Sequence, residues 1–298
     1  MKTLLITAPM PEGYFSQALR QLAPTLDLLE HRDDLSDAEI APVEAVLAWR
    51  LPPGLVARLP KLKWVCAVAA GVDKLLVPEL PAHVQVSRIV DADQAQGIAQ
   101  FVVLMALRHA RGLPAYEAQQ QRREWKRQPV AVVRSRVAML GTGAMGSVVA
   151  QLLGQIGFEV HGWNRRGEPL AEVLRAAEIV VCALPLTPQT EGLLDAHAFA
   201  AMPRGSYLIN IARGAHVVEP DLVAAVRSGH LAGAALDVQR NEPMAATDPL
   251  WDVPGITITP HIAAQSSPRT IAQQFLAGLD CVARGATPPH GVDRTRGY

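Results

Sequence analysis

The feature that most constrains the fold of this chain is a glycine-rich turn, "GTGAMG" at residues 141–146, which lies between two apolar segments. "RVAML" precedes it, and "SVVAQLLGQIG" follows it with apolar residues at helical spacing. Gly141, Gly143 and Gly146 form the pattern G-x-G-x-x-G, which alone is also compatible with a turn that binds nothing. Between a strand and a helix, the glycines allow a tight turn, close approach to a pyrophosphate, and close packing of helix on strand. The sequence therefore predicts a dinucleotide-binding strand–turn–helix unit.

Apolar segments that alternate with helical patterns predict two parallel sheets. Candidate strands of the second half lie at 136–140, 158–163, 178–184, 206–212, 232–238 and 255–260. In the first third, apolar segments lie at 3–8, 44–49 and 63–71, with a helical pattern at 14–22. Strands separated by helices are typical of doubly wound α/β folds. We therefore expect an α/β protein.

The length of the chain and one long helical pattern predict two domains. At 298 residues the chain is about twice a typical domain. A helical pattern from 93 to about 125 separates the two series of strands and is interrupted near Gly112 and Pro114. It is too long for an ordinary crossover helix, so we expect it to link domains or to dock a second subunit.

Charge and cysteine content restrict partners and location. Lys plus Arg and Asp plus Glu are equal at 28 each, so no global field attracts nucleic acid or an anionic membrane. Cys66 and Cys182 lie in apolar segments and, with Cys281, make an odd number, as expected for core residues in a reducing compartment. No stretch approaches the ~20 apolar residues of a membrane span. We expect a soluble cytoplasmic protein that binds neither nucleic acid nor membrane.

The end of the second strand of the dinucleotide unit carries arginines. The residue that reads the adenosine ribose is expected there, ~20 residues beyond the glycines, and in NAD-binding proteins it is an acid. This chain has Asn164, Arg165 and Arg166 instead. Guanidinium groups bind phosphate bidentately, and no acid repels a 2′-phosphate. The alternative is a solvated pair of surface arginines. We expect NADP as the cofactor, with NADPH preferred over NADH.

Polar residues end or follow the last three candidate strands. These residues are Arg213, Asp237 with nearby Glu242, and His261, and ligands of open α/β sheets bind at such strand ends. The set suits reduction of a 2-oxo acid: His261 donates a proton to the ketone oxygen, Glu242 holds the imidazole, and Arg213 binds the carboxylate. Arg213 or His261 alone is equally compatible with a structural role. A nicotinamide cofactor would supply the hydride, so we expect no metal.

Longer motifs extend these patterns. They are "GTGAMG", "CALPLTPQTEGLL" (182–194), "LINIARGAHVVEPDLVAAVRSGHLAGAALDVQRNEP" (208–243) and "ITPHIAA" (258–264). With them the chain resembles the D-isomer-specific 2-hydroxyacid dehydrogenase family over nearly its whole length. The resemblance implies a discontinuous, flavodoxin-like substrate domain of residues 1–94 and 268–298, and an NAD(P)-binding Rossmann domain of residues 95–267. It also implies a homodimer through the long helical segment, with Trp125 directed towards the partner subunit.

The resemblance assigns roles to individual residues. Arg213, Glu242 and His261 match the catalytic arginine, glutamate and histidine. The loop "AVAAGVDKL" resembles the family's substrate loop, in which Ala70, Gly71 and Val72 would hold the substrate carboxylate; the alternative for Gly71 is an ordinary turn glycine. The residues expected to contact the cofactor are Gly141, Thr142, Gly143, Ala144, Met145, Gly146, Asn164, Arg165, Arg166, Leu184, Pro185, Thr190, Ile211, Ala212, Asp237 and Ala263.

Some residues depart from the family pattern and indicate a branch. Ala263 and Ala264 stand where many members have glycine and small polar residues, and "ARGAHVVE" lacks the commoner aspartate or asparagine after the valine. These variants, together with Trp49, resemble the glyoxylate and hydroxypyruvate reductases. Trp49 is expected to bind substrate, or alternatively to be an apolar strand residue. We expect NADPH-dependent reduction of glyoxylate and hydroxypyruvate to glycolate and D-glycerate. A lactate- or phosphoglycerate-type dehydrogenase, and a nucleotide-sensing corepressor on the same fold, remain open.

Overall fold

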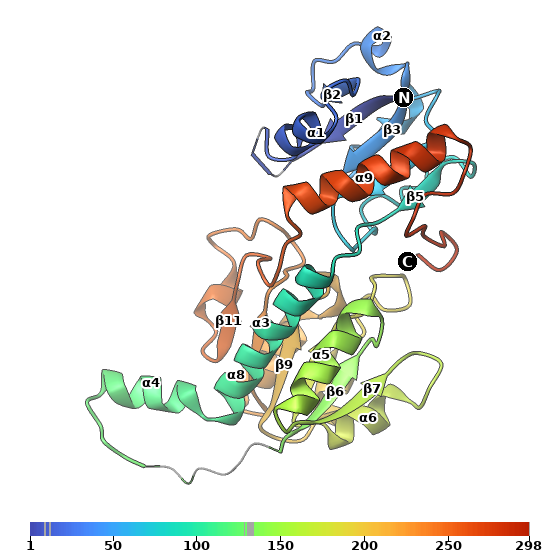
Figure 1. Cartoon of the computed structure of the whole chain (residues 1–298). Helices are drawn as coiled ribbons and strands as arrows, with labels where there is room; N and C mark the ends of the chain where they lie inside the picture. Colours follow the sequence, from blue (N-terminus) through green and yellow to red (C-terminus); the bar gives the residue numbers. More distant parts are fainter. Residues whose placement is uncertain (9, 12, 128, 130–133, 298) are drawn as a thin grey trace. The chain divides into compact units, whose positions relative to one another are not determined.

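The computed structural model of the chain describes residues 1–8, 10–11, 13–127, 129 and 134–297. By its internal contacts the chain divides into two compact units, residues 1–91 with 265–298 and residues 92–264 (Figure 1). The domain limits expected from the sequence, 94/95 and 267/268, lie close to this division. Residue 298, which the sequence places in the substrate domain, is outside the described residues.

The first unit is built on a parallel sheet in the order β2-β1-β3-β4-β5. The strands are β1 (Lys2–Ile6), β2 (Leu28–Glu30), β3 (Val43–Ala48), β4 (Trp64–Ala67) and β5 (Gln85–Ser87). In a doubly wound fold this 2-1-3-4-5 order is flavodoxin-like, with a switch point between the first and third strands. The flavodoxin-like fold expected for this part of the chain is confirmed.

Helices from both ends of the chain cover the first sheet. They are α1 (Ser16–Leu22), α2 (Asp37–Ile40), the 3₁₀ turn η1 (Val56–Arg58) and α9 (Pro268–Ala283). α9 packs beside α1, and its fully buried Phe275 stacks on Trp64 with ring centroids 4.8 Å apart. A Cβ on Gly278 would lie 2.6 Å from the same indole, so a glycine is needed at this crossing. Residues of the C-terminal segment therefore complete the core of the first unit.

The second unit has a parallel sheet in the order β11-β10-β9-β8-β6-β7. The strands are β6 (Arg136–Leu140), β7 (Glu159–Trp163), β8 (Ile179–Cys182), β9 (Ser206–Asn210), β10 (Leu231–Leu236) and β11 (Ile256–Ile258). β6 has the bounds expected from the sequence. β8 and β9 are buried at every position, as expected for central strands that are covered on both faces. The doubly wound sheet is confirmed, with its switch point between β6 and β8.

Helices lie on both faces of the second sheet (Figure 1). They are α3 (Ala92–Ala110), α5 (Ala144–Gln155), α6 (Leu170–Ala176), α7 (Ala196–Ala201) and α8 (Glu219–Arg227), with the 3₁₀ turns η2 (Gly214–His216) and η3 (Pro249–Asp252). α4 (Leu113–Gln121) projects from the end of α3 (Figure 1). α3 and α5 share one apolar cluster, and α6, α7 and α8 share another. The long helical pattern breaks at Gly112, whose φ of 65° is left-handed, so α3 and α4 are separate helices. No helix among the described residues is long and apolar enough to cross a membrane.

Both sheets bury a free cysteine. Cys66 lies in β4 and Cys182 ends β8, and burial raises the pKa of each thiol to about 12. Cys281, on α9, is only partly buried. The first two cysteines are therefore apolar core residues, as their sequence context predicts.

Candidate functional site

The glycine turn joins β6 directly to α5. Gly141 has a φ of 97°, and a Cβ on it would lie 2.7 Å from the Ala183 carbonyl oxygen. A Cβ on Gly146 would lie 1.9 Å from the Gly141 carbonyl oxygen, so the helix packs against the turn without room for a side chain. Gly143, the N-cap of α5, faces open space, because a Cβ on it would have no heavy atom within 4 Å. The N-terminus of a long helix therefore opens onto unfilled space, as binding of a pyrophosphate requires.

The remaining residues of the motif, Thr142, Ala144 and Met145, lie in this turn or in the first turn of α5. The Thr142 side chain packs over β7, where a Cβ on Gly162 would lie 2.6 Å from its Cγ2. Ala144 and Met145 open the first turn of α5. All six residues of the predicted motif thus lie where β6 meets α5.

A short turn after β7 carries the two arginines. Asn164 organises it, because its Oδ1 accepts from the Arg166 N–H at 3.0 Å and its carbonyl oxygen accepts from the Gly167 N–H at 3.0 Å. The Trp163 indole donates to the Glu168 carbonyl oxygen at 2.9 Å. Arg165 and Arg166 are exposed on this turn. The structure therefore presents two cations at the end of β7, the position expected for a ribose 2′-phosphate.

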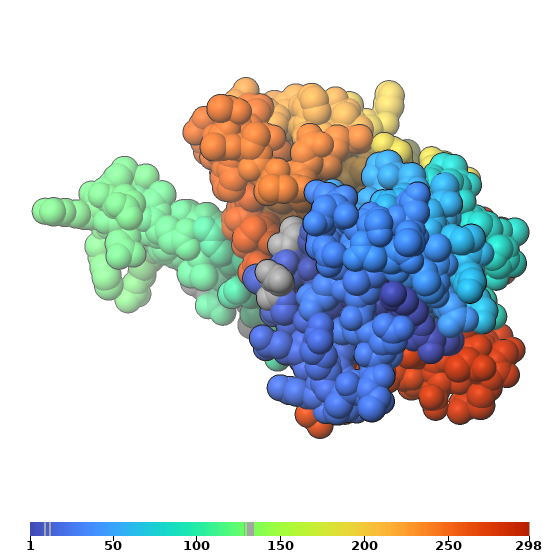
Figure 2. All heavy atoms as spheres, turned by 90° about the horizontal axis from the view of Figure 1, so that it is seen from above, coloured from blue at the N-terminus to red at the C-terminus, as the bar shows by residue number. Residues whose placement is uncertain are grey.

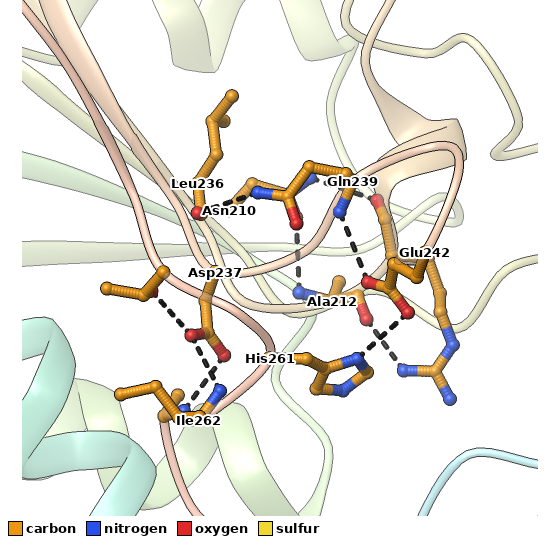
Figure 3. Close-up of polar contacts among 11 residues, drawn as sticks. Asn210, Ala212, Leu236, Asp237, Gln239, Glu242, His261 and Ile262 are labelled. Atoms are coloured by element: carbon orange, nitrogen blue, oxygen red, sulfur yellow. Dashed lines mark hydrogen bonds and ion pairs between the residues drawn. The ribbon is translucent and has the colours of Figure 1, made fainter. Parts of the chain in front are cut away.

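The loop after β9 holds Arg213 through Asn210. Asn210 is fully buried, its Nδ2 donates to the Arg213 carbonyl oxygen at 2.9 Å, and its Oδ1 accepts from the Ala212 N–H at 3.1 Å (Figure 3). The guanidinium of Arg213 donates to the Ala212 carbonyl oxygen at 2.7 Å. Ile211 continues the strand direction and donates from its N–H to the Cys182 carbonyl oxygen at 3.2 Å. One buried amide thus fixes the peptide that carries the arginine.

The loop after β10 meets the Arg213 loop closely. A Cβ on Gly214 would lie 1.9 Å from the Gln239 carbonyl carbon, so a glycine is required for this approach. Gln239 in turn donates from its backbone N–H to Glu242 Oε1 at 3.2 Å and from its side chain to the Leu236 carbonyl oxygen at 3.0 Å. These contacts bring Glu242 to the same edge of the sheet as Arg213.

Asp237 holds the loop that carries His261. Its carboxylate is 1% exposed and accepts three hydrogen bonds, from the Thr259 hydroxyl at 2.6 Å and from the N–H groups of Ile262 and Ala263 at 2.9 Å each (Figure 3). Its carbonyl oxygen accepts from the His261 N–H at 2.7 Å. His261 has a φ of 56°, an uncommon conformation that the surrounding bonds must support. Asp237 therefore positions the histidine loop; a contact between Asp237 and the cofactor stays a prediction.

Glu242 and His261 form a hydrogen-bonded pair at this edge. Nδ1 of His261 is 3.2 Å from Glu242 Oε2, and the two side chains are 28% exposed for His261 and 22% for Glu242. The pair is thus sheltered yet reachable by a small molecule. A carboxylate beside one ring nitrogen orients the ring and fixes its tautomer. The arrangement suits transfer of a proton from or to Nε2.

The loop after β8 is linked to the Arg213 loop through His216, whose ring nitrogens lie 3.3 Å from the Pro185 carbonyl oxygen and 3.0 Å from that of Arg213. Leu184 is buried, and the Thr190 hydroxyl donates to the Pro185 carbonyl oxygen at 2.7 Å while accepting from the Thr187 N–H at 2.9 Å. Thr190, 3% exposed, therefore closes the loop on itself. Its direct contact with a cofactor stays a prediction, as do those of Leu184 and Pro185.

The candidate substrate residues lie in the first unit. Ala70 and Gly71 are partly exposed, and Val72 is buried, with its carbonyl oxygen accepting from the N–H groups of Leu75 at 2.9 Å and Leu76 at 3.2 Å. Trp49 follows β3, packs against the core, and has the Lys74 ammonium 5.4 Å from its ring centroid. A role for this loop and for Trp49 in holding a substrate stays a prediction.

Four supporting residues were missed from the sequence: Asn210, His216, Gln239 and Thr259. Asn210 carried a usable signal, because it is a polar residue that ends an otherwise apolar segment, "SYLIN". The others act through loops that meet only in the folded chain. Among the described residues, no group of His, Cys, Asp and Glu is arranged to hold a metal ion.

A doubly wound sheet with an open glycine turn, and with an imidazole–carboxylate pair and an arginine at its strand ends, defines a dinucleotide-binding protein of the oxidoreductase type. Comparison with known proteins agrees. The family model described as "D-isomer specific 2-hydroxyacid dehydrogenase, NAD binding domain" matches residues 103–263. The chain therefore belongs to the D-isomer-specific 2-hydroxyacid dehydrogenase family.

Relatives named as glyoxylate/hydroxypyruvate reductases match the chain over nearly its full length. The chain is 34% identical to glyoxylate/hydroxypyruvate reductase A of Yersinia enterocolitica, over 94% of each chain. It is 37% identical to a Xanthobacter autotrophicus Py2 family member solved with NADPH and MES, with a TM-score of 0.89 over 100% of this chain and 99% of that one. An NADPH-dependent glyoxylate/hydroxypyruvate reductase of Sinorhizobium meliloti, solved with NADP and sulfate, is 30% identical with a TM-score of 0.89 over 100% of both chains. The expected resemblance to the glyoxylate/hydroxypyruvate reductase branch is confirmed.

Proposed function

We propose that this protein reduces small 2-oxo acids, glyoxylate and hydroxypyruvate first, to glycolate and D-glycerate with NADPH. The observation that carries the proposal is the His261–Glu242 pair, 3.2 Å apart, on the sheet edge that also carries Arg213. The names of the full-length relatives support the same reaction. In this proposal residues 92–264 form the cofactor-binding domain, and residues 1–91 with 265–298 form the substrate domain.

The chemistry follows from the three side chains. Arg213 binds the substrate carboxylate and draws charge towards the carbonyl oxygen. His261, held by Glu242, donates its Nε2 proton to that oxygen as negative charge develops there, and is left neutral. A bound NADPH supplies the hydride to the carbonyl carbon. The hydroxy acid thus gains one hydride and one proton, and the protein regains its proton from solvent.

The glycine turn and the arginine turn fit NADPH. Gly143 leaves open space at the N-terminus of α5, where the pyrophosphate would lie. Arg165 and Arg166, exposed on the turn after β7, would bind the 2′-phosphate. Loss of one charge-assisted hydrogen bond costs roughly 1.5 to 3 kcal/mol, so Arg165→Ala should weaken NADPH binding about ten-fold or more and leave NADH binding nearly unchanged. Arg175→Ala, which removes an exposed cation that pairs with Glu172 on α6, is the matched control.

A panel of 2-oxo acids assayed with NADPH and with NADH tests the proposal. We expect the highest kcat/KM with glyoxylate or hydroxypyruvate and NADPH. Preference for pyruvate or for a phosphorylated 2-oxo acid would favour the lactate- or phosphoglycerate-type alternative. Nucleotide binding without turnover of any 2-oxo acid would favour the corepressor.

We also propose a homodimer through α3 and α4. Leu104, Leu113 and Trp125 are 58%, 47% and 95% exposed, although they lie on or just after these helices. The atoms of α4, green in the space-filling view, stand clear of the yellow and orange atoms of their own unit (Figure 2). A second copy would bury these side chains. Sedimentation at micromolar concentration should give a dimer, and a monomer would refute this.

We further propose a cytoplasmic location, which the three free cysteines support.

A further inference from the structure

His216 is a fully buried histidine between the loop of Arg213 and the loop of Pro185. Its Nδ1 lies 3.0 Å from the carbonyl oxygen of Arg213, and its Nε2 lies 3.3 Å from the carbonyl oxygen of Pro185. Either neutral tautomer of the ring donates to one of these oxygens, and the charged ring donates to both. The imidazole therefore bridges the end of β9 and the loop after β8 from inside the protein.

The backbones on both sides of this bridge have hydrogen bonds of their own. The His216 carbonyl oxygen accepts from the Leu194 N–H at 2.9 Å, and Leu194 also forms a parallel bridge with Val217. On the other side, the Pro185 carbonyl oxygen already accepts from the Thr190 hydroxyl at 2.7 Å. Removing the imidazole therefore leaves both segments attached to the unit.

The Arg213 peptide depends more on the ring. Its carbonyl oxygen faces three donors, Asn210 Nδ2 at 2.9 Å, His216 Nδ1 at 3.0 Å and the His216 backbone N–H at 3.2 Å. The ring also ties this peptide to the loop of Pro185. Without the ring the peptide keeps its bonds to Asn210 and to the His216 backbone but loses that tie, so the guanidinium that projects from the same residue is held less firmly.

We propose that His216 is a positioning residue for Arg213, acting through the hydrogen bond from Nδ1 to the Arg213 carbonyl oxygen. The inference rests on the proposed role of Arg213 in binding the substrate carboxylate. A guanidinium grips a carboxylate with two parallel bonds, so a small rotation of the arginine peptide weakens both. His216 touches neither substrate nor cofactor, and its effect falls on the 2-oxo acid rather than on NADPH.

Three substitutions separate the two contacts of the ring. His216→Asn puts an amide nitrogen as many bonds from Cα as Nδ1, His216→Gln puts one near the place of Nε2, and His216→Leu removes both donors. Loss of the Nδ1 bond should raise the KM for glyoxylate about ten-fold in the Leu and Gln variants. The Asn variant should stay within about three-fold of the parent protein, and the KM for NADPH should change little in all three. Calorimetric binding of oxalate to the NADP⁺-loaded protein should follow the same order without turnover.

His230 provides a matched control in the same unit. Its Nε2 faces the carbonyl oxygens of Phe199 and Met202 at 2.9 and 3.0 Å, so it also bridges two backbone oxygens. His230→Leu should lower the melting temperature and leave both KM values unchanged.

The outcomes separate this inference from the proposed function. If His216→Leu lowers only the melting temperature, as His230→Leu does, His216 is merely structural and the inference is wrong. Equal KM values for glyoxylate in the Asn and Gln variants would overturn it as well, even if the Leu variant does not fold. A parent protein that neither reduces any 2-oxo acid nor binds oxalate would instead overturn the proposed role of Arg213, and this inference with it.

Discussion

The two sheets of this protein begin with the same strand order but differ in the turn that follows the first strand. In each sheet the first strand lies between the second and the third, β2-β1-β3 and β7-β6-β8. Residues 7–15 separate β1 from α1, whereas residues 141–143 separate β6 from α5. Only a glycine-rich turn as short as the second brings a long helix's N-terminus directly over the strand end. Strand order thus sets where a site can form, and the turn decides whether a phosphate can bind there.

The strand ends differ as well. β9, β10 and β11 are followed by Arg213, Asp237 and His261, whose loops are tied together by hydrogen bonds. In the first unit β3 is followed by Trp49 and β4 by the loop around Gly71. The second sheet therefore carries the groups proposed to move a proton, and the proposed role of the first is confined to binding.

The largest expected effect tests this difference between the two sheets by substituting one histidine in each unit. His261 in the second unit and His290 in the first both have a φ of 56°. His261→Asn should lower kcat by about 10² to 10⁴, as expected for a lost general acid, with NADPH binding nearly intact. Asparagine tolerates this backbone conformation, so the fold should be kept. His290→Asn is the control and should leave kcat unchanged; a similar loss in both variants would show that the two units do not differ as described.

A second prediction compares two glycines of the second unit, Gly143 in the glycine turn and Gly154 in α5. Gly143→Ala adds a methyl group where the protein has open space, so stability should hardly change. The same methyl group would block the approach of a pyrophosphate, and NADPH affinity should fall about ten-fold or more. Gly154→Ala, in the last turn of α5 and also in open space, should instead stabilise the helix by at most roughly 0.5 to 1 kcal/mol without changing affinity. Fluorescence titration with NADPH and thermal melting measure the two quantities separately.

The third prediction concerns pH and applies to the second unit alone. Reduction consumes a proton held by His261, so its kcat/KM should fall as pH rises, while that of oxidation should fall as pH decreases. Glu242→Gln removes the charged hydrogen-bond partner of Nδ1. The kcat of reduction should therefore fall across the profile, while the KM for NADPH should change little. An unchanged kcat in this variant would mean that Glu242 does not orient the proton donor.

The smallest expected effect is the pH dependence of stability that comes from one buried cysteine in each sheet, and it should be equal in the two sheets. Burial raises the pKa of Cys66 and Cys182 to about 12, so both thiols are neutral when folded. A free thiol ionises near pH 8.5, so this contribution to stability is complete below ~8.5 and is lost as pH rises towards 12. At pH 8 a thiol reagent should label Cys281 rapidly and the other two only on unfolding. Rapid labelling of either buried cysteine would mean that its sheet opens locally.

Sequence patterns predicted most of the fold because most strands are apolar and bounded by turns. β6 was predicted residue for residue, since "RVAML" runs directly into the glycine turn. β2 and β5 were missed: "LLE" and "QVS" are three-residue strands, too short to show an alternating pattern, and pairing with β1 and β4 defines them. Short edge strands of this kind depend on tertiary contacts rather than on local preference.

The sequence pointed to the charged groups of the candidate site, whereas the residues that support those groups were missed. Arg213, Glu242 and His261 stand at strand ends, where sequence order alone indicates that they share an edge. His216 and Gln239 support Arg213 and Glu242 by hydrogen bonds within their own loops, and His216 also reaches the loop of Pro185, which is distant in the sequence. No periodicity encodes such contacts, because they depend on how closely the Gly214 and Gln239 backbones approach.

The hydrogen bonds between Asp237 and the loop of His261 have a consequence for hydrogen exchange of the backbone amides in that loop. Ile262 is 52% exposed, yet its amide, like that of Ala263, is bonded to a carboxylate that is 1% exposed. Exchange at these amides requires the end of β10 to open, because the acceptor belongs to that strand end. A loop without regular secondary structure should therefore exchange at rates close to those of the central sheet, beneath a side chain that solvent reaches freely.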